Sequence, residues 1–568
     1  MTWTSWLTLF LLVNCIHFIS TWKLYQAAGK KAWEAAIPIY NAIVLMEIIH
    51  RPRWWTLLML IPIINLIIIP VIWVETLRSF GFNSNKDTAA VLLTAGLYTA
   101  NKNYGGELQY IKDRSITPRT AFGEWVSSIL FAVVAATLVH TYIMQPYIIP
   151  TGSLEKTLLI GDFLLVSKFH FGSRVPMTTV SFPMVHDTIP FFKIRSYLKK
   201  PQLPYLRLPG IEKVERNEIV VFSWPADTVR QFFVKEAGVR KPIDKKSNYV
   251  KRCVGIPGDT LQIIDGLVHI DGERTQLPDR ARVQYVHTIL NEKGISAQSL
   301  LNAGYKDFTR TYKVKNITQQ SFTALRPYIL GTQGSSVEDF RVITNSKGLP
   351  IEVVRDLRLQ VTEVLERERQ LTLTLKEAED LARESWIDMV VRKNQVEKIP
   401  NTNFFPNSLP YDWNEDNFGP LVLPKAGMKI RLNDENYPLY KKIIQEYEQN
   451  DFFKKGNSFF INGKETEEYT FQQDYYWMMG DNRHRSEDSR YWGFVPADHI
   501  VGKPVFIWFS IEGINDGIKN WRIRWERLFT TIGLDGKPRS YFPHFLVVLA
   551  LYQIFSWYRK RKSKKEAA

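Results

Sequence analysis

Apolar residues along this chain are gathered into four long runs. The runs cover residues 3–20, 55–74, 125–142 and 541–558. A helix needs roughly 20 apolar residues to cross the hydrocarbon core of a bilayer, so each run is a candidate membrane span. Trp and Tyr near their ends are typical of a membrane surface. The first run has neither a basic leader nor a small-residue cleavage site, so it predicts a retained helix rather than a signal peptide.

The second run leaves the number of crossings open. It is interrupted by Pro62 and Pro70, and the loops on both sides of it, 21–54 and 75–124, are basic. One full crossing would place one basic loop outside, against the positive-inside rule. Either a re-entrant second run or an additional short crossing near residues 88–100 would resolve the conflict.

Between the third and fourth runs, the pattern changes to short apolar stretches separated by turn signals. Pro-Gly and Asp-Gly pairs are typical of turns between strands. Residues 349–395 are charged and Leu-rich, with apolar spacing that predicts helices. We therefore expect a mainly β soluble catalytic domain with a large mixed α/β insertion, anchored by N-terminal and C-terminal transmembrane helices. The predicted strands are 163–166, 218–222, 261–264 and 503–510.

These patterns divide the chain into seven parts. Residues 520–529 alternate basic and aromatic side chains, which suits a helix at the membrane surface; a solvated amphipathic helix is the alternative. The parts are an N-terminal membrane region (1–120), a transmembrane helix (121–143), a catalytic β domain (144–274 and 471–515), an insertion (275–470), an amphipathic interfacial segment (516–540), a C-terminal transmembrane helix (541–558) and a basic cytoplasmic tail (559–568).

Positive charge sets the predicted orientation. The formal net charge is +16, and residues 559–568 hold one dense basic block. Such a block can bind nucleic acid, but this one follows an apolar run, so we interpret it as a cytoplasmic anchor and expect no nucleic-acid partner. Lys and Arg precede the third run, and none follows it until Lys156. The β domain is then expected outside, at the outer face of the membrane, with membrane lipids as partners; the oligomeric state stays open.

The cysteines and histidines of this chain indicate neither a disulfide nor a zinc site. Cys15 lies in an apolar run and Cys253 in the soluble part, and the chain has no other cysteine. A disulfide between them is not expected, and the scattered histidines give no zinc-site spacing. We expect no metal and no cofactor.

A serine in a tight turn beyond the third run is a candidate nucleophile. Ser153 and Lys156 form an S-x-x-K motif, as in β-lactamases and penicillin-binding proteins, but the partner K-T-G or K-S-G is absent. A serine nucleophile needs a base. Lys251 lies in an apolar strand whose burial would lower its pKa. On local sequence alone, a solvated strand lysine paired with an acid is the more ordinary interpretation of Lys251.

Three separated segments together resemble the type I bacterial signal peptidases. In order, they are similar to the family patterns P-[ST]-x-S-M-x-P-T-L-x-x-G-D, Y-[IV]-K-R-x-[VI]-G-x-P-G-D and G-D-N-R-x-x-S-x-D-S-R-x-W-G. The resemblance implies antiparallel sheets and a membrane-bound Ser/Lys protease of the bacterial inner membrane. Its partners would be exported preproteins, whose signal peptides it removes after small residues such as A-x-A. The segments are 150–162, 249–259 and 480–493, with 216–222 similar to the family's R-G-D-[IV]-V-V-F strand.

The resemblance also implies roles for individual residues. Ser153 would be the nucleophile and Lys251 the general base, with Ser486 orienting its amine. The Thr151 hydroxyl and the Ser153 backbone N–H would form the oxyanion hole. The supporting charged residues would be Asp488, Arg490, Asp481 and Arg483, and the substrate pocket would be lined by Ile149, Pro150, Leu154, Tyr249 and Val250.

The chain departs from the family pattern at a few positions near these residues. Leu154 replaces Met, Lys156 replaces Pro, and His484-Arg485 replaces the commoner Asp-Asn. Two other interpretations stay open: a penicillin-recognising acyl enzyme that uses Lys156, and a non-catalytic membrane scaffold. A soluble Ser/Lys self-cleaving repressor is disfavoured by the apolar runs.

Overall fold

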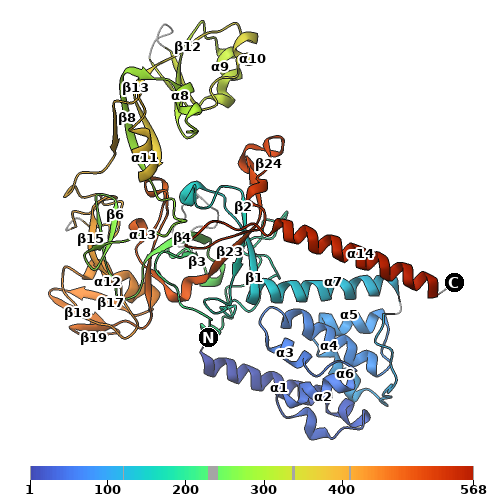
Figure 1. The fold of residues 1–568 in the computed structure, drawn as a ribbon. Helices are drawn as coiled ribbons and strands as arrows, with labels where there is room; N and C mark the ends of the chain where they lie inside the picture. The colour runs from blue at the N-terminus through green and yellow to red at the C-terminus, as the bar shows by residue number, and fades with distance from the viewer. Residues whose placement is uncertain (1, 119, 228–240, 335–339, 409–410, 567–568) are drawn as a thin grey trace.

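The computed structural model describes residues 2–118, 120–227, 241–334, 340–408 and 411–566. A helical bundle occupies the N-terminal part, and a β domain with a long extension follows it (Figure 1). Helix α1 begins after Thr2, whose hydroxyl accepts a hydrogen bond from the Ser5 N–H and so caps the helix. The bundle contains α1 (Trp3–Ala27), α2 (Tyr40–Ile48), α3 (Trp55–Leu60), α4 (Asn65–Ser79), α5 (Asn85–Leu93) and α6 (Tyr98–Tyr104).

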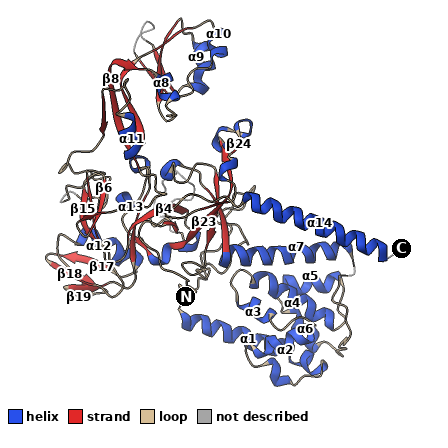
Figure 2. Cartoon of the chain, in the orientation of Figure 1, coloured by secondary structure: helices blue, strands red, loops and turns tan. Residues whose placement is uncertain are grey.

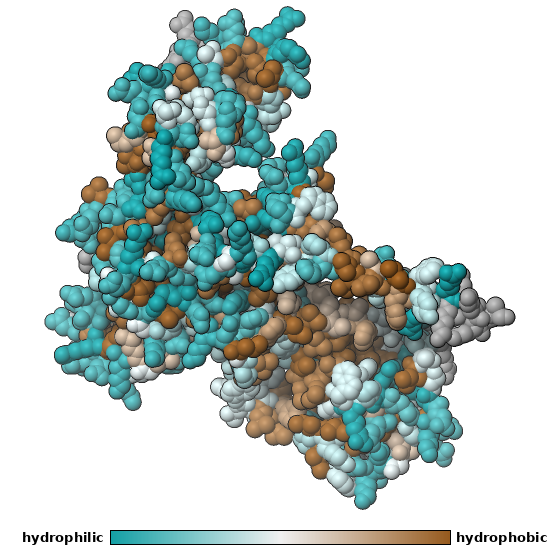
Figure 3. All heavy atoms as spheres, viewed as in Figure 1, coloured by the Kyte–Doolittle hydropathy of each residue, from teal (hydrophilic) through white to brown (hydrophobic). Residues whose placement is uncertain are grey.

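Two described helices are long and apolar enough to cross a membrane. They are α1 and the helix Ala121–Ile143, which consists of α7 (Ala121–Leu138) and one π-helical turn. The C-terminal apolar run lies in α14 (Phe542–Glu566), which is long enough at 25 residues but is not among the helices apolar enough to be counted. Figure 3 shows that hydrophobic residues gather over this helical side of the molecule, whereas the β domain is mostly hydrophilic.

The second apolar run, over residues 55–74, is not one continuous helix. The chain leaves the helical conformation at Ile61, Ile63 has a φ of 70°, and α3 and α4 have only six and fifteen residues. Pro62 explains the break, because proline disfavours a helical conformation at the residue before it. Neither half is long enough to span a bilayer.

The predicted β domain is confirmed as a curled antiparallel sheet. All four predicted strands are present. Three of them are β2, β3 and β23 of this sheet, whose order is β1-β2-β23-β3-β4-β21-β22 with β24 and β25 on β23, and the predicted strand 261–264 lies in a second sheet. Apolar side chains pack on both faces of this sheet. The strands are β1 (Met144–Ile148), β2 (Asp162–Ser167), β3 (Ile219–Ser223), β4 (Asn248–Gly255), β21 (Tyr475–Met479), β22 (Val495–Pro496), β23 (Ile500–Glu512), β24 (Arg522–Ile523) and β25 (Thr530–Thr531).

The predicted insertion divides into two parts. Phe405, Phe418 and Tyr440 share one core with Trp477 and Phe494 of the β domain, so residues from about 400 onward pack onto that domain. Here β15 (Phe418–Val422) extends the sheet of β5 (Thr260–Ile264), β6 (Leu267–Ile270) and β7 (Glu273–Arg274). The remaining small elements of this part are β16 (Lys429–Arg431), α12 (Tyr437–Lys442), β17 (Phe452–Lys455), β18 (Ser458–Ile461), β19 (Lys464–Glu465) and β20 (Glu468–Thr470).

The other part of the insertion is an extension that projects from the β domain (Figure 2). Its stem is the sheet of β8 (Gln284–Ile295), β13 (Glu366–Thr374) and β14 (Met389–Arg392), with α11 (Leu375–Leu381) beside it. The helices predicted over 349–395 are therefore only partly present, because strands occupy much of this range. The outer part contains α8 (Ala297–Asn302), β9 (Thr309–Lys315), α9 (Gln319–Leu325), β10 (Gly331–Gln333), β11 (Arg341–Asn345), α10 (Ile351–Asp356) and β12 (Gln360–Glu363).

Residues 520–529, within the segment 516–540, do not form the amphipathic helix that their sequence suggests. The segment consists of short 3₁₀ turns and of β24 and β25, which pair with β23. Arg527 forms a 2.5 Å ion pair with Asp162, and Arg524 donates a hydrogen bond to the Ile160 carbonyl. These two arginines therefore hold the segment against the β domain.

Candidate active site

Ser153 lies in a turn that the sheet and the core hold on both sides. A 3₁₀ turn, Gly152–Leu154, follows β1. Backbone hydrogen bonds join Ile149 to Asp162 and Gly161, and the side chains of Ile149 and Leu154 are buried in the core between them. The serine between these anchors is half-buried, whereas Pro150 and Thr151 are exposed.

Lys251 lies in β4, an inner strand of the sheet. It is opposite Val220 of β3, and its neighbours Arg252 and Cys253 pair with β21. Only 2% of Lys251 is exposed. Burial lowers the pKa of its amine to about 8, although the carboxylate of Asp488 opposes this shift. The amine lies 5.7 Å from the centre of the Tyr249 ring. A pKa near 8 leaves part of the amine neutral at physiological pH, as a general base requires.

Gly480 brings Ser486 close to the nucleophile turn. It follows β21 directly, and a Cβ at this position would lie 2.2 Å from Ser486 Oγ and 2.6 Å from the Ser153 carbonyl oxygen. The adjacent Asn482 donates a 3.0 Å hydrogen bond from its backbone N–H to the same carbonyl. Its side-chain amide donates to the Gly152 carbonyl at 3.2 Å. The loop 480–486 thus fixes the turn that carries Ser153.

Three polar groups in this region have no hydrogen-bond partner among the described residues. Ser486 Oγ is buried and unpaired, and neither Ser153 Oγ nor the Lys251 amine donates or accepts a hydrogen bond within the described parts of the chain. Buried polar groups are nearly always paired in proteins. Their unsatisfied state is typical of a site that completes its hydrogen bonds with a substrate.

Two buried ion pairs surround these groups. Arg490 contacts both carboxylate oxygens of Asp488 at 2.9 Å, and Arg252 contacts those of Asp481 at 2.7 and 2.6 Å. Burial alone would raise the pKa of each carboxyl, but the adjacent arginine outweighs it and holds the pKa below the usual value. Arg483 forms no ion pair with a described residue, so the two charges at 481 and 483 do not pair with each other.

The predicted insertion contacts three of the positions where the sequence departs from the family pattern. Lys156 pairs with Glu377 at 2.5 Å, His484 Nε2 lies 2.9 Å from Asp416, and Arg485 pairs with Asp307 at 2.6 Å. Glu377, Asp416 and Asp307 all belong to the predicted insertion. Sequence reasoning missed these partners, since nothing in their local sequence marks them.

Strand β8 of the extension also forms hydrogen bonds with the loops of the candidate site. The Gln284 backbone N–H donates to the Asp481 carbonyl at 2.7 Å, and its side chain donates to the Glu155 carbonyl. The Val286 N–H donates to His484 Nδ1 at 3.0 Å. The extension is therefore attached to both loops that form the site.

Comparison with known proteins gives two family matches. Residues 122–324 and 424–509 match the model of "Signal peptidase, peptidase S26". Residues 33–113 match a family of unknown function, DUF5684. The first match includes the segments of Ser153, Lys251 and Ser486.

Several curated proteins that resemble this chain are named signal peptidase I. Signal peptidase I of Rickettsia massiliae and that of Rickettsia felis are each 30% identical to this chain over 188 residues, which is 33% of this chain and 55% of the relative. The chain thus matches about half the length of these relatives. Signal peptidase I of Haemophilus influenzae is 22% identical over 447 residues, covering 76% of this chain and 82% of the relative.

Proposed function

Because this chain belongs to the signal peptidase family, peptidase S26, we propose that it is a membrane-anchored serine endopeptidase that removes signal peptides from exported preproteins. The observation that carries this proposal is the convergence at Gly480. There, the turn that carries Ser153 meets Ser486, and the strand of the buried Lys251 lies beside them. The side-chain polar groups of these three residues have no hydrogen-bond partner in the part of the chain that the structure describes. A scaffold without catalysis would have no reason to keep a buried, unpaired lysine.

Ser153 and Lys251 would act as nucleophile and base. The neutral amine of Lys251 takes the proton of Ser153 Oγ as the oxygen attacks the scissile carbonyl, and the resulting ammonium protonates the leaving amine. Water then hydrolyses the acyl-enzyme with the same base. Ser486 orients the amine. The Ser153 N–H and the exposed Thr151 hydroxyl stabilise the oxyanion.

The surface around the nucleophile favours small substrate residues. Ile149 and Leu154 are 4% and 1% exposed, so they form a closed floor rather than a deep pocket. Val250 packs on the same cluster, and Pro150 and Tyr249 would border it. A shallow apolar surface of this kind accommodates an alanine side chain and rejects larger ones.

The predicted topology remains part of this proposal. Helix α1 and the helix Ala121–Ile143 would anchor the chain in a bacterial inner membrane. The catalytic domain would lie on the periplasmic face and the basic tail in the cytoplasm, with α14 as a further crossing. The break between α3 and α4 fits a re-entrant segment in the second run.

The penicillin-recognising alternative needs Lys156 as the base, and its environment disfavours this role. The Lys156 amine is held by the carboxylate of Glu377 at 2.5 Å. As a hydrogen-bond donor to this carboxylate, the Lys156 amine is already engaged, whereas the Lys251 amine has no such partner among the described residues.

A cleavage assay tests the proposed activity. The full chain, purified in detergent, is expected to cut a preprotein after the second Ala of an A-x-A sequence, and mass spectrometry of the product identifies the bond. A preprotein with bulky residues in place of both alanines is the control and should be cut at least tenfold more slowly. Uncut preprotein, or equal cleavage of both substrates, would refute the proposal.

The ion pair between Lys156 and Glu377 is expected to position the nucleophile turn without performing chemistry. Both side chains are about one-third exposed, so the pair should contribute no more than about 1 kcal/mol to stability. We expect Lys156→Met and Glu377→Gln each to lower kcat several-fold, with no further loss in the double variant. Steady-state kinetics on the three variants measures this coupling. Additive losses would show that the two residues act independently.

A further inference from the structure

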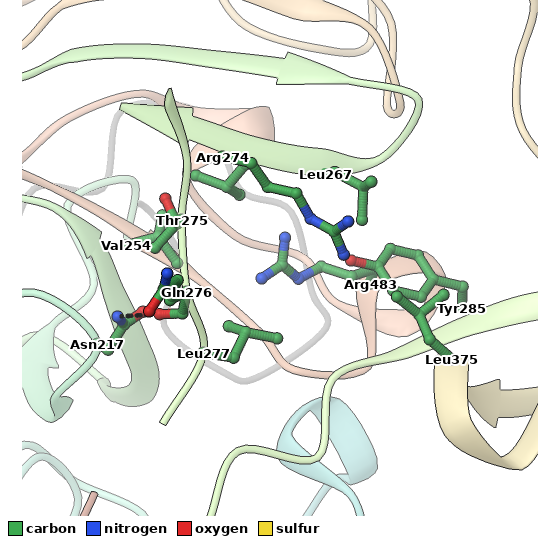
Figure 4. Close-up of a pocket in the computed structure, with 11 residues that line it drawn as sticks. Asn217, Val254, Leu267, Arg274, Thr275, Gln276, Leu277, Tyr285, Leu375 and Arg483 are labelled. Carbon is green, nitrogen blue, oxygen red and sulfur yellow. Dashed lines mark hydrogen bonds between the residues drawn. The ribbon is translucent and has the colours of Figure 1, made fainter. Parts of the chain in front are cut away.

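A cavity of about 520 Å³ lies beside the active-site loop, between the hairpin of β6 and β7, the start of β8 and the first residue of α11. Figure 4 shows the side chains that line it. Two of them, Arg274 and Arg483, are cationic, and none of the described lining residues is acidic. The cavity is therefore electropositive.

The buried guanidinium of Arg483 is the main evidence for a ligand in this cavity. It is 2% exposed, its Nε and Nη1 have no hydrogen-bond partner among the described residues, and its guanidinium extends into the cavity (Figure 4). Arginine stays protonated in proteins, and an unpaired buried charge is costly. The neighbouring carboxylates of Asp481 and Asp488 are already occupied by Arg252 and Arg490. No carboxylate of a described residue forms an ion pair with Arg483, so a ligand anion can make this contact.

The other lining groups indicate what kind of ligand fits. Thr275 Oγ1 is a buried polar atom without a partner in the described structure, and it can donate a hydrogen bond to an anion. Arg274 is exposed and lies at the same cavity. Apolar side chains form most of the remaining wall: Val254, Leu267, Val268, Leu277 and Leu375. A bare inorganic ion would leave this apolar volume unfilled.

We propose that the cavity binds a small organic anion, a carboxylate or phosphate group attached to an apolar body. The planar guanidinium of Arg483 holds two oxygens of such a group, and Arg274 supplies a second positive charge. Arg483 directly follows Asn482, whose N–H binds the Ser153 carbonyl. An anion at Arg483 would therefore brace the loop that fixes the nucleophile turn.

Calorimetric titration of the full chain in detergent tests this site with four probes: phenyl phosphate, benzoate, neutral benzamide and inorganic phosphate. We expect phenyl phosphate or benzoate to bind at least tenfold more tightly than benzamide and inorganic phosphate. The tighter of the first two shows whether the site prefers a phosphate or a carboxylate. Equal binding of benzamide, or no binding of either organic anion, would overturn the proposal.

Arginine variants locate the binding. Arg483→Gln is expected to weaken the tighter probe at least tenfold. Arg274→Gln, at an exposed position that the fold tolerates, is expected to weaken it several-fold. Arg431→Gln is the matched control, since Arg431 is a surface arginine paired with Glu467, and should bind normally. Unchanged binding in both cavity variants would overturn the assignment. The readout is binding, so its failure would leave the proposed peptidase activity untouched.

Discussion

Replacing Lys251 by Met is expected to reduce kcat/KM for preprotein cleavage by about 10²–10⁴-fold, the range for loss of a general base. The reason is that Lys251 is the buried amine beside the Ser486 loop, with its pKa lowered to about 8. Ser153→Ala should be at least as damaging. Lys156→Met is the matched control and should keep at least a tenth of the activity. The reverse order, with Lys156→Met inactive and Lys251→Met active, would replace this mechanism by the S-x-x-K alternative.

The pH dependence of kcat/KM is a second test of Lys251 as the general base. A base with a pKa of about 8 is mostly protonated at pH 7, so kcat/KM should rise about tenfold per pH unit below 8 and level off above it. A profile that is flat from pH 6 to 9 would contradict Lys251 as the base.

The Lys251→Met variant should have lower activity than the wild type but a more stable fold. The folded pKa of about 8 is below the unfolded value near 10.5. The lysine therefore destabilises the fold fully below pH 8, and this cost disappears as the pH rises through 10.5. At about 1.4 kcal/mol per pKa unit, the cost is about 3 kcal/mol at pH 7. Lys251→Met should thus unfold at a higher temperature than the wild type at pH 7, which shows that its inactivity is not a folding defect.

The sequence predicts the central part of the fold because its signals there are local. The predicted strands 163–166, 218–222 and 503–510 follow from short apolar runs and turn residues, and they lie where the pattern places them, as β2, β3 and β23. Pro62 also marks the break in the second run, for which the sequence alone leaves a full crossing and a re-entrant segment both open. The proline decides the outcome through the conformation of the single residue before it.

The extension could not be predicted, because its contacts join positions far apart in the chain. Lys156 looks like a second catalytic amine beside Ser153, yet its partner Glu377 lies 221 residues later. Likewise, residues from about 400 onward pack against Trp477 through side chains that no periodicity connects. Such contacts depend on the tertiary path of the chain. The departures Lys156, His484 and Arg485 become meaningful only when their partners in the insertion are known.

Gly480→Ala is expected to reduce kcat/KM by about 10²-fold or more while the protein still folds. The added methyl group would lie 2.2 Å from Ser486 Oγ and 2.6 Å from both Ser486 Cβ and the Ser153 carbonyl oxygen. A rotation of the Ser486 hydroxyl relieves only the first contact, so the backbone of one loop must move. A shift of about 1 Å in a catalytic group costs on the order of 10²-fold in rate. Kinetics and thermal unfolding measure the two effects.

Gly331→Ala is the matched control for this substitution. Gly331 lies in β10 of the extension, and a Cβ there would meet only the Ile343 side chain at 3.9 Å, so its activity and stability should match the wild type. The double variant Gly480→Ala with Ser486→Ala removes the 2.2 Å contact but keeps the clash with the Ser153 carbonyl. It should therefore remain as slow as Gly480→Ala alone or become slower. Recovery of activity in the double variant would mean that only the Ser486 hydroxyl had been displaced, and that the Ser153 turn does not depend on this glycine.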